Sequence, residues 1–191
     1  ATIFLLGYFI TAPIFGALAE RYPRKNLIAL GILIWSVATV CTGLVHSLPM
    51  MFVARAFVGV GEASFVTLAP TIINDVVAPE KKGRSLAIFF LAVPLGGALG
   101  FLIGGFIGKN YGWRETFFVA GGPGVVLAMT CLLIEDPAQK FVQAKTKLID
   151  AASELLRIPM FRIAVIGYCA HTAAVGAFAF WAPSYLVKEF G

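Results

Sequence analysis

Charged residues are scarce in this chain of 191 amino acids. Asp, Glu, Lys and Arg together make up 13% of it and hydrophobic residues make up 59%, whereas about 25% of the residues in an ordinary soluble domain are charged. The longest stretches that contain none of these four charged residue types are 1–19, 26–54, 85–108, 116–134 and 163–187. A helix that crosses a bilayer needs about 20 mostly apolar residues. The sequence therefore excludes a soluble domain and predicts an all-α integral membrane protein.

Cysteine and histidine are too few and too scattered for a cross-linked or metal-binding protein. Cys41, Cys131 and Cys169 each lie inside an apolar stretch, with no Cys-x-x-Cys spacing and no nearby histidine in ligand register. His46 and His171 are lone histidines with no second ligand in metal-binding register. We therefore expect no disulfide, no metal site and no cofactor, and we assign neither histidine a role.

Three functional classes lack their sequence signals. The net charge of +5 does not indicate nucleic-acid binding, because the Lys and Arg residues lie between apolar stretches instead of forming one patch. The chain has no Gly-x-x-x-x-Gly-Lys-[Ser/Thr] loop for ATP, so we expect a gradient to supply the energy for any transport. It also has no His/Asp/Ser or His/Glu grouping that could supply an enzyme's nucleophile and base. We therefore expect neither a nucleic-acid-binding protein nor an enzyme.

Turns that contain charge or proline divide the chain into six predicted membrane-spanning helices. The predicted spans are 1–19, 27–45, 50–73, 86–107, 117–134 and 163–186. The first is not a signal peptide, because no basic segment precedes it and no small-residue cleavage site follows it.

The distribution of positive charge predicts the orientation of these spans. The turns on one side hold most of the basic residues: Arg21, Arg24, Lys25, Lys81, Lys82, Arg84, Lys140, Lys145, Lys147, Arg157 and Arg162. The other side holds only Lys109, Arg114 and Lys188. Because cytoplasmic turns carry the positive excess, the first side is predicted to be cytoplasmic, and Ala1 then lies outside the cytoplasm. We expect a multi-pass protein of the inner (plasma) membrane, and its abrupt ends lead us to expect a fragment.

The long connection 135–160 contains an amphipathic pattern. Its apolar positions repeat at helical spacing opposite charged ones, the apolar set being Leu148, Ile149, Ala152, Leu155 and Leu156. The pattern predicts a helix on the cytoplasmic membrane surface. A regulatory element is the alternative, but we favour a tether between two bundles, because nothing in the segment can do chemistry.

Arg55 and Glu62 are ionisable residues inside a predicted span. A charge at the bilayer centre costs about 3 kcal/mol even on a forgiving scale, so both need partners or water. Seven residues amount to about two helical turns and about 10 Å along the axis. We therefore expect both to face one direction, with a polar cavity or an acid of another helix between them. Both residues are predicted to take part in proton coupling and in substrate binding, with Glu62 carrying the proton and Arg55 holding its counter-charge or a lipid phosphate. A static buried pair is the alternative.

Residues 16–25 read Gly-Ala-Leu-Ala-Glu-Arg-Tyr-Pro-Arg-Lys, so a small residue, Gly16, stands where we expect two helices to approach closely. This segment resembles the loop motif between the second and third helices of the major facilitator superfamily, with Glu20 in place of Asp and Pro23 in place of Gly. Arg55 to Ala63, Pro94 with the glycines that follow it, and Trp113-Arg114-x-x-Phe117 resemble further motifs of that superfamily. The stripe of Gly96, Gly100, Gly104 and Gly108 can let another helix pack closely.

Two further segments resemble one particular family within that superfamily. Gly61-Glu62-Ala63-Ser64-Phe65-x-Thr67-x-Ala69-Pro70-Thr71-Ile72-Ile73-x-Asp75 and Phe180-Trp181-Ala182-Pro183-Ser184 are similar to the fourth and seventh helices of the spinster family. The resemblance implies helices two to seven of a twelve-helix transporter. It assigns 1–134 to an N-terminal bundle that lacks its first helix, 135–160 to a cytoplasmic linker, and 161–191 to the first helix of the C-terminal bundle.

The function that the resemblance implies is secondary active transport of a lysophospholipid or sphingoid-type lipid, coupled to protons, by a monomer that works through alternating access. A proton-coupled carrier of organic anions or drugs is one alternative, and a membrane lipid sensor or lipid-modifying enzyme is another. Charges at the cytoplasmic helix ends are expected to latch helix termini in one state. The residues of this predicted conformational switch are Gly16, Glu20, Arg21, Arg24, Lys25, Asp75 and Arg84.

Overall fold

The computed structural model describes residues 2–133 and 148–190, and within these residues it is helical with no strand. The helices are α1 (Thr2–Leu18), α2 (Arg24–Leu44), α3 (Leu48–Val76), α4 (Lys82–Asn110), α5 (Trp113–Cys131), α6 (Leu148–Arg157) and α7 (Pro159–Phe190), with a short 3₁₀ turn at Pro79–Lys81. Ile134 and residues 135–147 of the expected linker lie outside the described residues.

Six of the helices lie where six spans were predicted. Most are longer than the predicted spans, because a helix continues past the hydrocarbon region to where Lys and Arg reach water. Thus α2 begins at Arg24, directly after Pro23, and α4 begins at Lys82. Within the described residues, the segments long and apolar enough to cross a membrane are Arg24–Leu44, Leu48–Val76, Pro79–Asn110 and Pro159–Phe190. The helix α1 is apolar but shorter, with 17 residues.

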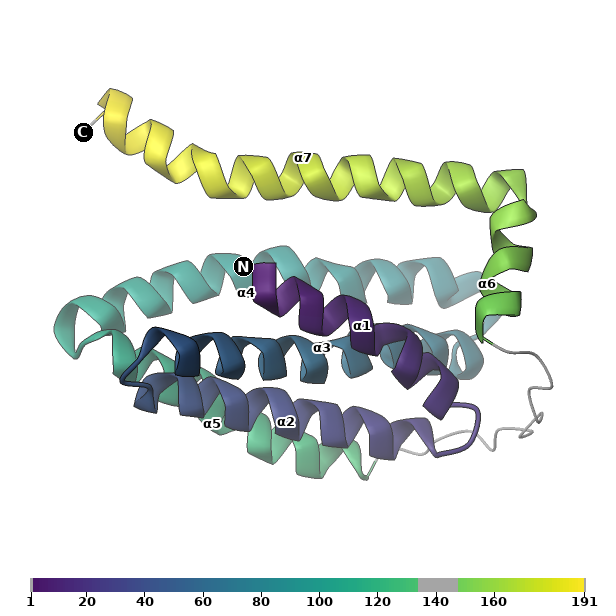
Figure 1. Ribbon diagram of the computed structural model, residues 1–191, viewed down its shortest axis with the longest axis horizontal. Helices are drawn as coiled ribbons and strands as arrows, with labels where there is room; N and C mark the ends of the chain where they lie inside the picture. The colour runs from purple at the N-terminus through teal and green to yellow at the C-terminus, as the bar shows by residue number, and fades with distance from the viewer. Residues whose placement is uncertain (1, 134–147, 191) are drawn as a thin grey trace. The chain divides into compact units, whose positions relative to one another are not determined.

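The described residues fall into two compact units, one holding α1 to α5 and the other α6 and α7. In the first unit α2 is central, because it packs along α3 and also along α5, while α1 packs against α3 (Figure 1). The helix α4 contacts α5 and α3 much less extensively. Small side chains and a few large ones form the core between α1, α2 and α3, among them Phe15, Ile28, Ile32, Ala63 and Leu68.

Glycine allows the close crossing of α2 and α3. A Cβ atom on Gly61 would collide with the carbonyl oxygen of Gly31 and with Trp35, and one on Gly31 would collide with Ser64. Next to this crossing, Ser64 Oγ donates a hydrogen bond of 2.7 Å to the carbonyl oxygen of Leu27. Small residues that let backbones approach, supported by a hydroxyl between helices, are the usual means of helix association where lipid surrounds both partners.

The glycine stripe of α4 has fewer partners than its spacing suggested. Cβ positions on Gly96, Gly97 and Gly100 have no described atom within 4 Å. Those on Gly104 and Gly108 reach only Thr116 of α5, at 3.4 and 3.8 Å. Among the described residues, the stripe therefore meets another helix only in its last turns, at α5, and the distances there would leave room for an ordinary side-chain contact.

The second unit contains the helix expected from the amphipathic pattern. The helix α6 covers Leu148–Arg157, with Leu155 and Leu156 exposed, and it contacts α7. The helix α7 runs for 32 residues from Pro159, four residues before its apolar stretch begins.

Candidate functional site

Arg55 and Glu62 lie on α3 at different depths. Both are half-buried. Arg55 is seven residues from the start of the helix at Leu48 and Glu62 is at its midpoint, so about 10 Å of helix axis separates them. Within the described ranges, no acid pairs with Arg55 and no base pairs with Glu62. The structure therefore does not join these two residues as an ion pair.

The partner of Arg55 is an aromatic ring. The guanidinium carbon lies over the ring of Phe117, 4.9 Å from its centroid. Phe117 is in the first turns of α5, where the edge-on ring of Trp113 meets it with the two centroids 5.9 Å apart. The sequence placed Phe117 at the entry of its helix but did not reveal this contact, because Arg55 and Phe117 belong to helices far apart in the chain.

A hydrogen bond fixes the start of α5 against the end of α2. Arg114 Nη2 donates to the carbonyl oxygen of Val45 over 3.2 Å, and its guanidinium lies over the Trp113 ring at 4.4 Å. Val45 follows the last residue of α2. The turn between α2 and α3 and the turn between α4 and α5 therefore lie at the same end of the unit.

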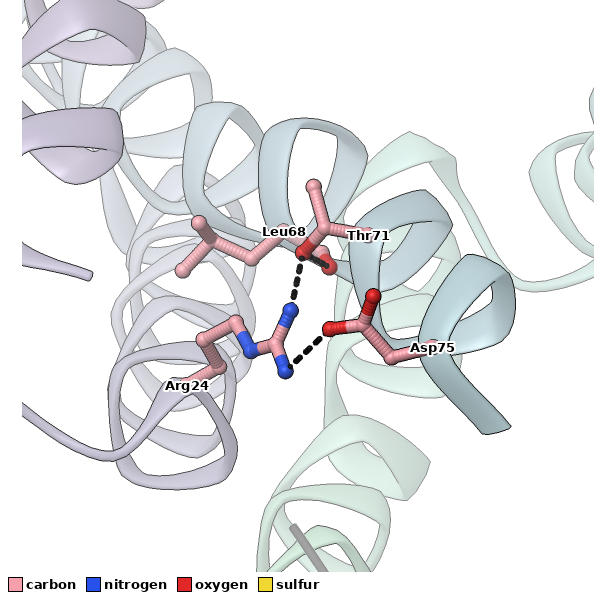
Figure 2. A network of polar contacts seen from close by, with 4 residues as sticks. All are labelled: Arg24, Leu68, Thr71 and Asp75. Atoms are coloured by element: carbon pink, nitrogen blue, oxygen red, sulfur yellow. Dashed lines mark hydrogen bonds and ion pairs between the residues drawn. The ribbon is translucent and has the colours of Figure 1, made fainter. Parts of the chain in front are cut away.

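A polar network lies at the opposite end of α2 (Figure 2). Arg24 Nη2 and Asp75 Oδ2 are 2.7 Å apart, and Arg24 Nη1 donates to Thr71 Oγ1 over 3.1 Å. The Thr71 hydroxyl in turn donates to the carbonyl oxygen of Leu68 over 2.7 Å. Arg24 is only 5% exposed, whereas the Asp75 side chain is 47% exposed. We call these three side chains, Arg24, Thr71 and Asp75, the α2–α3 network.

The other residues of the predicted switch are not part of this network. Glu20, Arg21 and Arg84 are exposed, and Lys25 is half-buried. A Cβ atom on Gly16 would have no described atom within 4 Å, so the close approach expected there is absent from the described residues. The approach that involves α1 is instead at Gly7 and Gly59, where α1 and α3 cross. The point at which two helices cross depends on the side chains of both helices. The loop motif contains residues of only one of them.

A groove of about 870 Å³ lies between α2 and α3. Apolar side chains line it, including Val37, Cys41, Val53 and Phe57, and neither Arg55 nor Glu62 is among them. It is therefore not the polar cavity expected between these two residues. Among the described residues, no group of three His, Cys, Asp or Glu side chains could hold a metal ion.

Sequence comparison relates the chain to known membrane proteins over its full length. Residues 1–191 match the profile of the Major Facilitator Superfamily. "Protein spinster" of Drosophila melanogaster is 33% identical over 192 residues, which are 97% of this chain and 32% of that protein. "Protein spinster homolog 1" of Homo sapiens is 33% identical over 200 residues, covering 98% of this chain and 38% of that protein. "Probable sphingolipid transporter spinster homolog 1" of Arabidopsis thaliana is 29% identical, covering 96% and 44%.

A solved structure shows the same relationship. The chain is similar to the crystal structure of a bacterial homologue of the human lysosomal transporter spinster in an inward-facing, unoccupied conformation, with a TM-score of 0.63 and 26% sequence identity. The match covers 76% of this chain and 36% of that one. The chain thus spans less than half the length of each of these relatives. The resemblance to spinster proteins predicted from the motifs of α3 and α7 is confirmed, as is the all-helical fold.

Proposed function

The chain belongs to the Major Facilitator Superfamily, a family of transporters rather than enzymes, and from that membership we propose that it serves the proton-coupled transport of a lysophospholipid or sphingoid-type lipid. Relatives named spinster, one of them named as a sphingolipid transporter, support the class of substrate. The proposed mechanism is alternating access, in which helix bundles rock around a site near the middle of the membrane.

One observation carries the proton-coupling part of this proposal. Glu62 is a half-buried carboxyl at the midpoint of α3, and no base pairs with it within the described ranges. A static structural carboxylate at that depth would need a partner to offset the cost of burying its charge. A carboxyl that gains and loses a proton as its surroundings change needs no permanent base. Glu62 is therefore the proposed proton carrier.

Arg55 is the proposed contact for the substrate's head group. A guanidinium offers five N–H donors in a plane, which match the oxygens of a phosphate in pairs. Because Arg55 pairs with no acid in the described part of the chain, its charge is not neutralised by the protein there. Arg55 lies closer than Glu62 to Leu48, the first residue of α3. We therefore propose that the head group binds at Arg55 and the proton at Glu62, at different depths in the membrane.

The α2–α3 network is the proposed conformational element. Its ion pair joins two helices of one unit, so it makes the cytoplasmic ends of α2 and α3 move as one body during the rocking motion. Glu20, Arg21, Lys25 and Arg84 lie near that end and are proposed to contact other helix termini in one of the two states.

Replacing Glu62 with Gln tests the proposed proton coupling. The amide keeps the size of the side chain but cannot exchange a proton, so lipid accumulation driven by a pH gradient should fall about tenfold or more while the protein still folds. The measurement is uptake of a labelled lysolipid into proteoliposomes with and without the gradient. Glu115→Gln, at an exposed position at the start of α5, is the matched control. Full accumulation by Glu62→Gln would remove Glu62 from the mechanism.

A further inference from the structure

We infer that Phe117 is a positioning residue, which holds the guanidinium of Arg55 so that its N–H edges can bind an anionic head group independently of Glu62. The inference rests on the proposed function of Arg55, and it adds a residue of another helix to that site. It begins from the contact in which the Arg55 guanidinium lies over the Phe117 ring, 4.9 Å from the centroid.

The kind of partner matters for the chemistry of Arg55. A carboxylate partner would cancel the positive charge and occupy the guanidinium N–H groups. An aromatic ring stabilises a cation through the negative face of its π system and accepts no bond from the guanidinium edges. An arginine held in this way keeps its charge and its five donors for a ligand. The contact with Phe117 therefore leaves Arg55 able to bind an anionic ligand, and it does not favour a role for Arg55 as the counter-ion of a carboxylate in the protein.

The beginning of α5 is built to hold Phe117 at this place. The Trp113 ring meets the Phe117 ring edge-on, at 85°. Arg114 ties the same turn to α2 through the carbonyl oxygen of Val45. Gly43 in the last turn of α2 lets α5 come close, since a Cβ atom there would lie 2.8 Å from the Phe118 ring and 3.0 Å from the carbonyl oxygen of Arg114. Phe117 thus presents its ring from a turn that is fixed on α2.

The test compares two lipids with the same acyl chain, lysophosphatidylglycerol and an uncharged monoacylglycerol. Phe117→Leu should raise the dissociation constant and KM for lysophosphatidylglycerol about fivefold, because the cation loses its aromatic support, and should leave those for monoacylglycerol within about twofold. Phe117→Tyr keeps an aromatic face and should restore binding of the charged lipid. Phe118→Leu removes a neighbouring ring that lies close to Gly43 and over which no arginine of the described residues is stacked, so it controls for packing.

Two kinds of result would overturn the inference: an equal loss of affinity for both lipids, or a Phe118→Leu variant that reproduces the head-group effect. Failure of Phe117→Tyr to restore the affinity would also overturn it. Equilibrium binding to the detergent-solubilised protein gives this answer without any transport step. Absence of lipid flux in the wild-type protein would instead refute the proposed function, so the two failures are distinguishable. If Phe117→Leu does not fold, Phe117→Met replaces it as the variant without an aromatic ring at position 117, and the same expected and contradicting results apply to its comparison with wild type, Phe117→Tyr and Phe118→Leu.

Discussion

Arg24 brings a charge into a site where only 5% of its surface stays exposed. As the first residue of α2 it follows Pro23 directly, and the helix geometry turns its side chain toward α3 and not toward water. There Asp75 and Thr71 supply acceptors from α3. A basic residue that simply orients a protein in the membrane needs no acceptors from another helix. Arg24 therefore has a structural role in addition to any topological one.

The two partners of this ion pair should differ in the cost of their removal. Asp75→Asn leaves the buried guanidinium without the carboxylate and should lower the free energy of unfolding on the order of 2 kcal/mol. Arg24→Gln leaves a carboxylate that is 47% exposed and can be hydrated, so its cost should stay below about 1 kcal/mol. Thermal denaturation of the detergent-solubilised protein measures both.

The matched control for this pair is Asp150→Asn on α6, where the side chain is exposed. It should leave the melting temperature unchanged, since isolated surface charges contribute little. Equal losses from Arg24→Gln and Asp75→Asn would mean that the burial of Arg24 does not determine the strength of the α2–α3 network.

At the scale of elements, α2 is the helix on which the first unit depends. Glycines and small polar residues bring it close to both neighbours: Gly31 and Gly61 at α3, and Gly43, Gly121 and Gly124 at α5. In contrast, α4 presents most of its glycines to no described atom. Glycine in a membrane helix therefore marks a close crossing only where another helix actually meets it.

Two glycine substitutions test this difference. Gly61→Ala places a methyl group against the backbone of α2, which cannot move away as a flexible side chain could. It should cost about 1–3 kcal/mol of stability. The methyl group added by Gly97→Ala would have no described atom within 4 Å. This substitution should leave the free energy of unfolding unchanged or raise it by up to about 1 kcal/mol, because alanine favours a helix.

Thermal denaturation in one detergent, with both variants made from the same parent, gives the comparison. A Gly61→Ala protein as stable as the parent would show that α2 and α3 can separate without loss. A large loss from Gly97→Ala would reveal a partner for α4 beyond the described residues.

At the scale of the whole molecule, the two ends of the first unit differ in the number of basic residues that they carry. The contact of Arg24 with Asp75 shows that the start of α2 and the end of α3 lie at one end, with the turn that holds Lys81 and Lys82 next to it. Arg114 and Val45 mark the other end. Most of the basic residues described in this unit therefore lie at one end. Cytoplasmic turns attract such an excess, so that end is predicted to face the cytoplasm.

Cysteine labelling tests this orientation. In a background with Cys41→Ser, Cys131→Ser and Cys169→Ser, Ser47→Cys should react with a membrane-impermeant maleimide on intact cells. Glu80→Cys should react only after permeabilisation, because the positive end faces inward. A permeant maleimide should label both variants and so controls for reactivity. Labelling of Glu80→Cys on intact cells would reverse the predicted orientation.

The sequence alone determined the features that depend on residues close together in the chain. Apolar length determined where the helices lie, because a bilayer requires about 20 such residues in a row. Spacing within one helix determined the amphipathic character of α6 and the two turns between Arg55 and Glu62. Motifs carried by single helices were enough to indicate the family. The predicted ends of the helices were less accurate, as at α2 and α4, because charged residues can lie either inside a helix or beyond its end.

Contacts between helices were decided only by the tertiary structure. The sequence predicted that Arg24 and Asp75 share a membrane side, but not that α3 buries Arg24 and pairs the two. It marked Arg55 as a charge in need of a partner, but the partner is the ring of Phe117 on a distant helix. It suggested a close approach at Gly16 of α1, whereas the described close crossing of α1 is with α3, at Gly7 and Gly59. Each contact depends on the angle and offset at which two helices pack, and these follow from the side chains of both surfaces together.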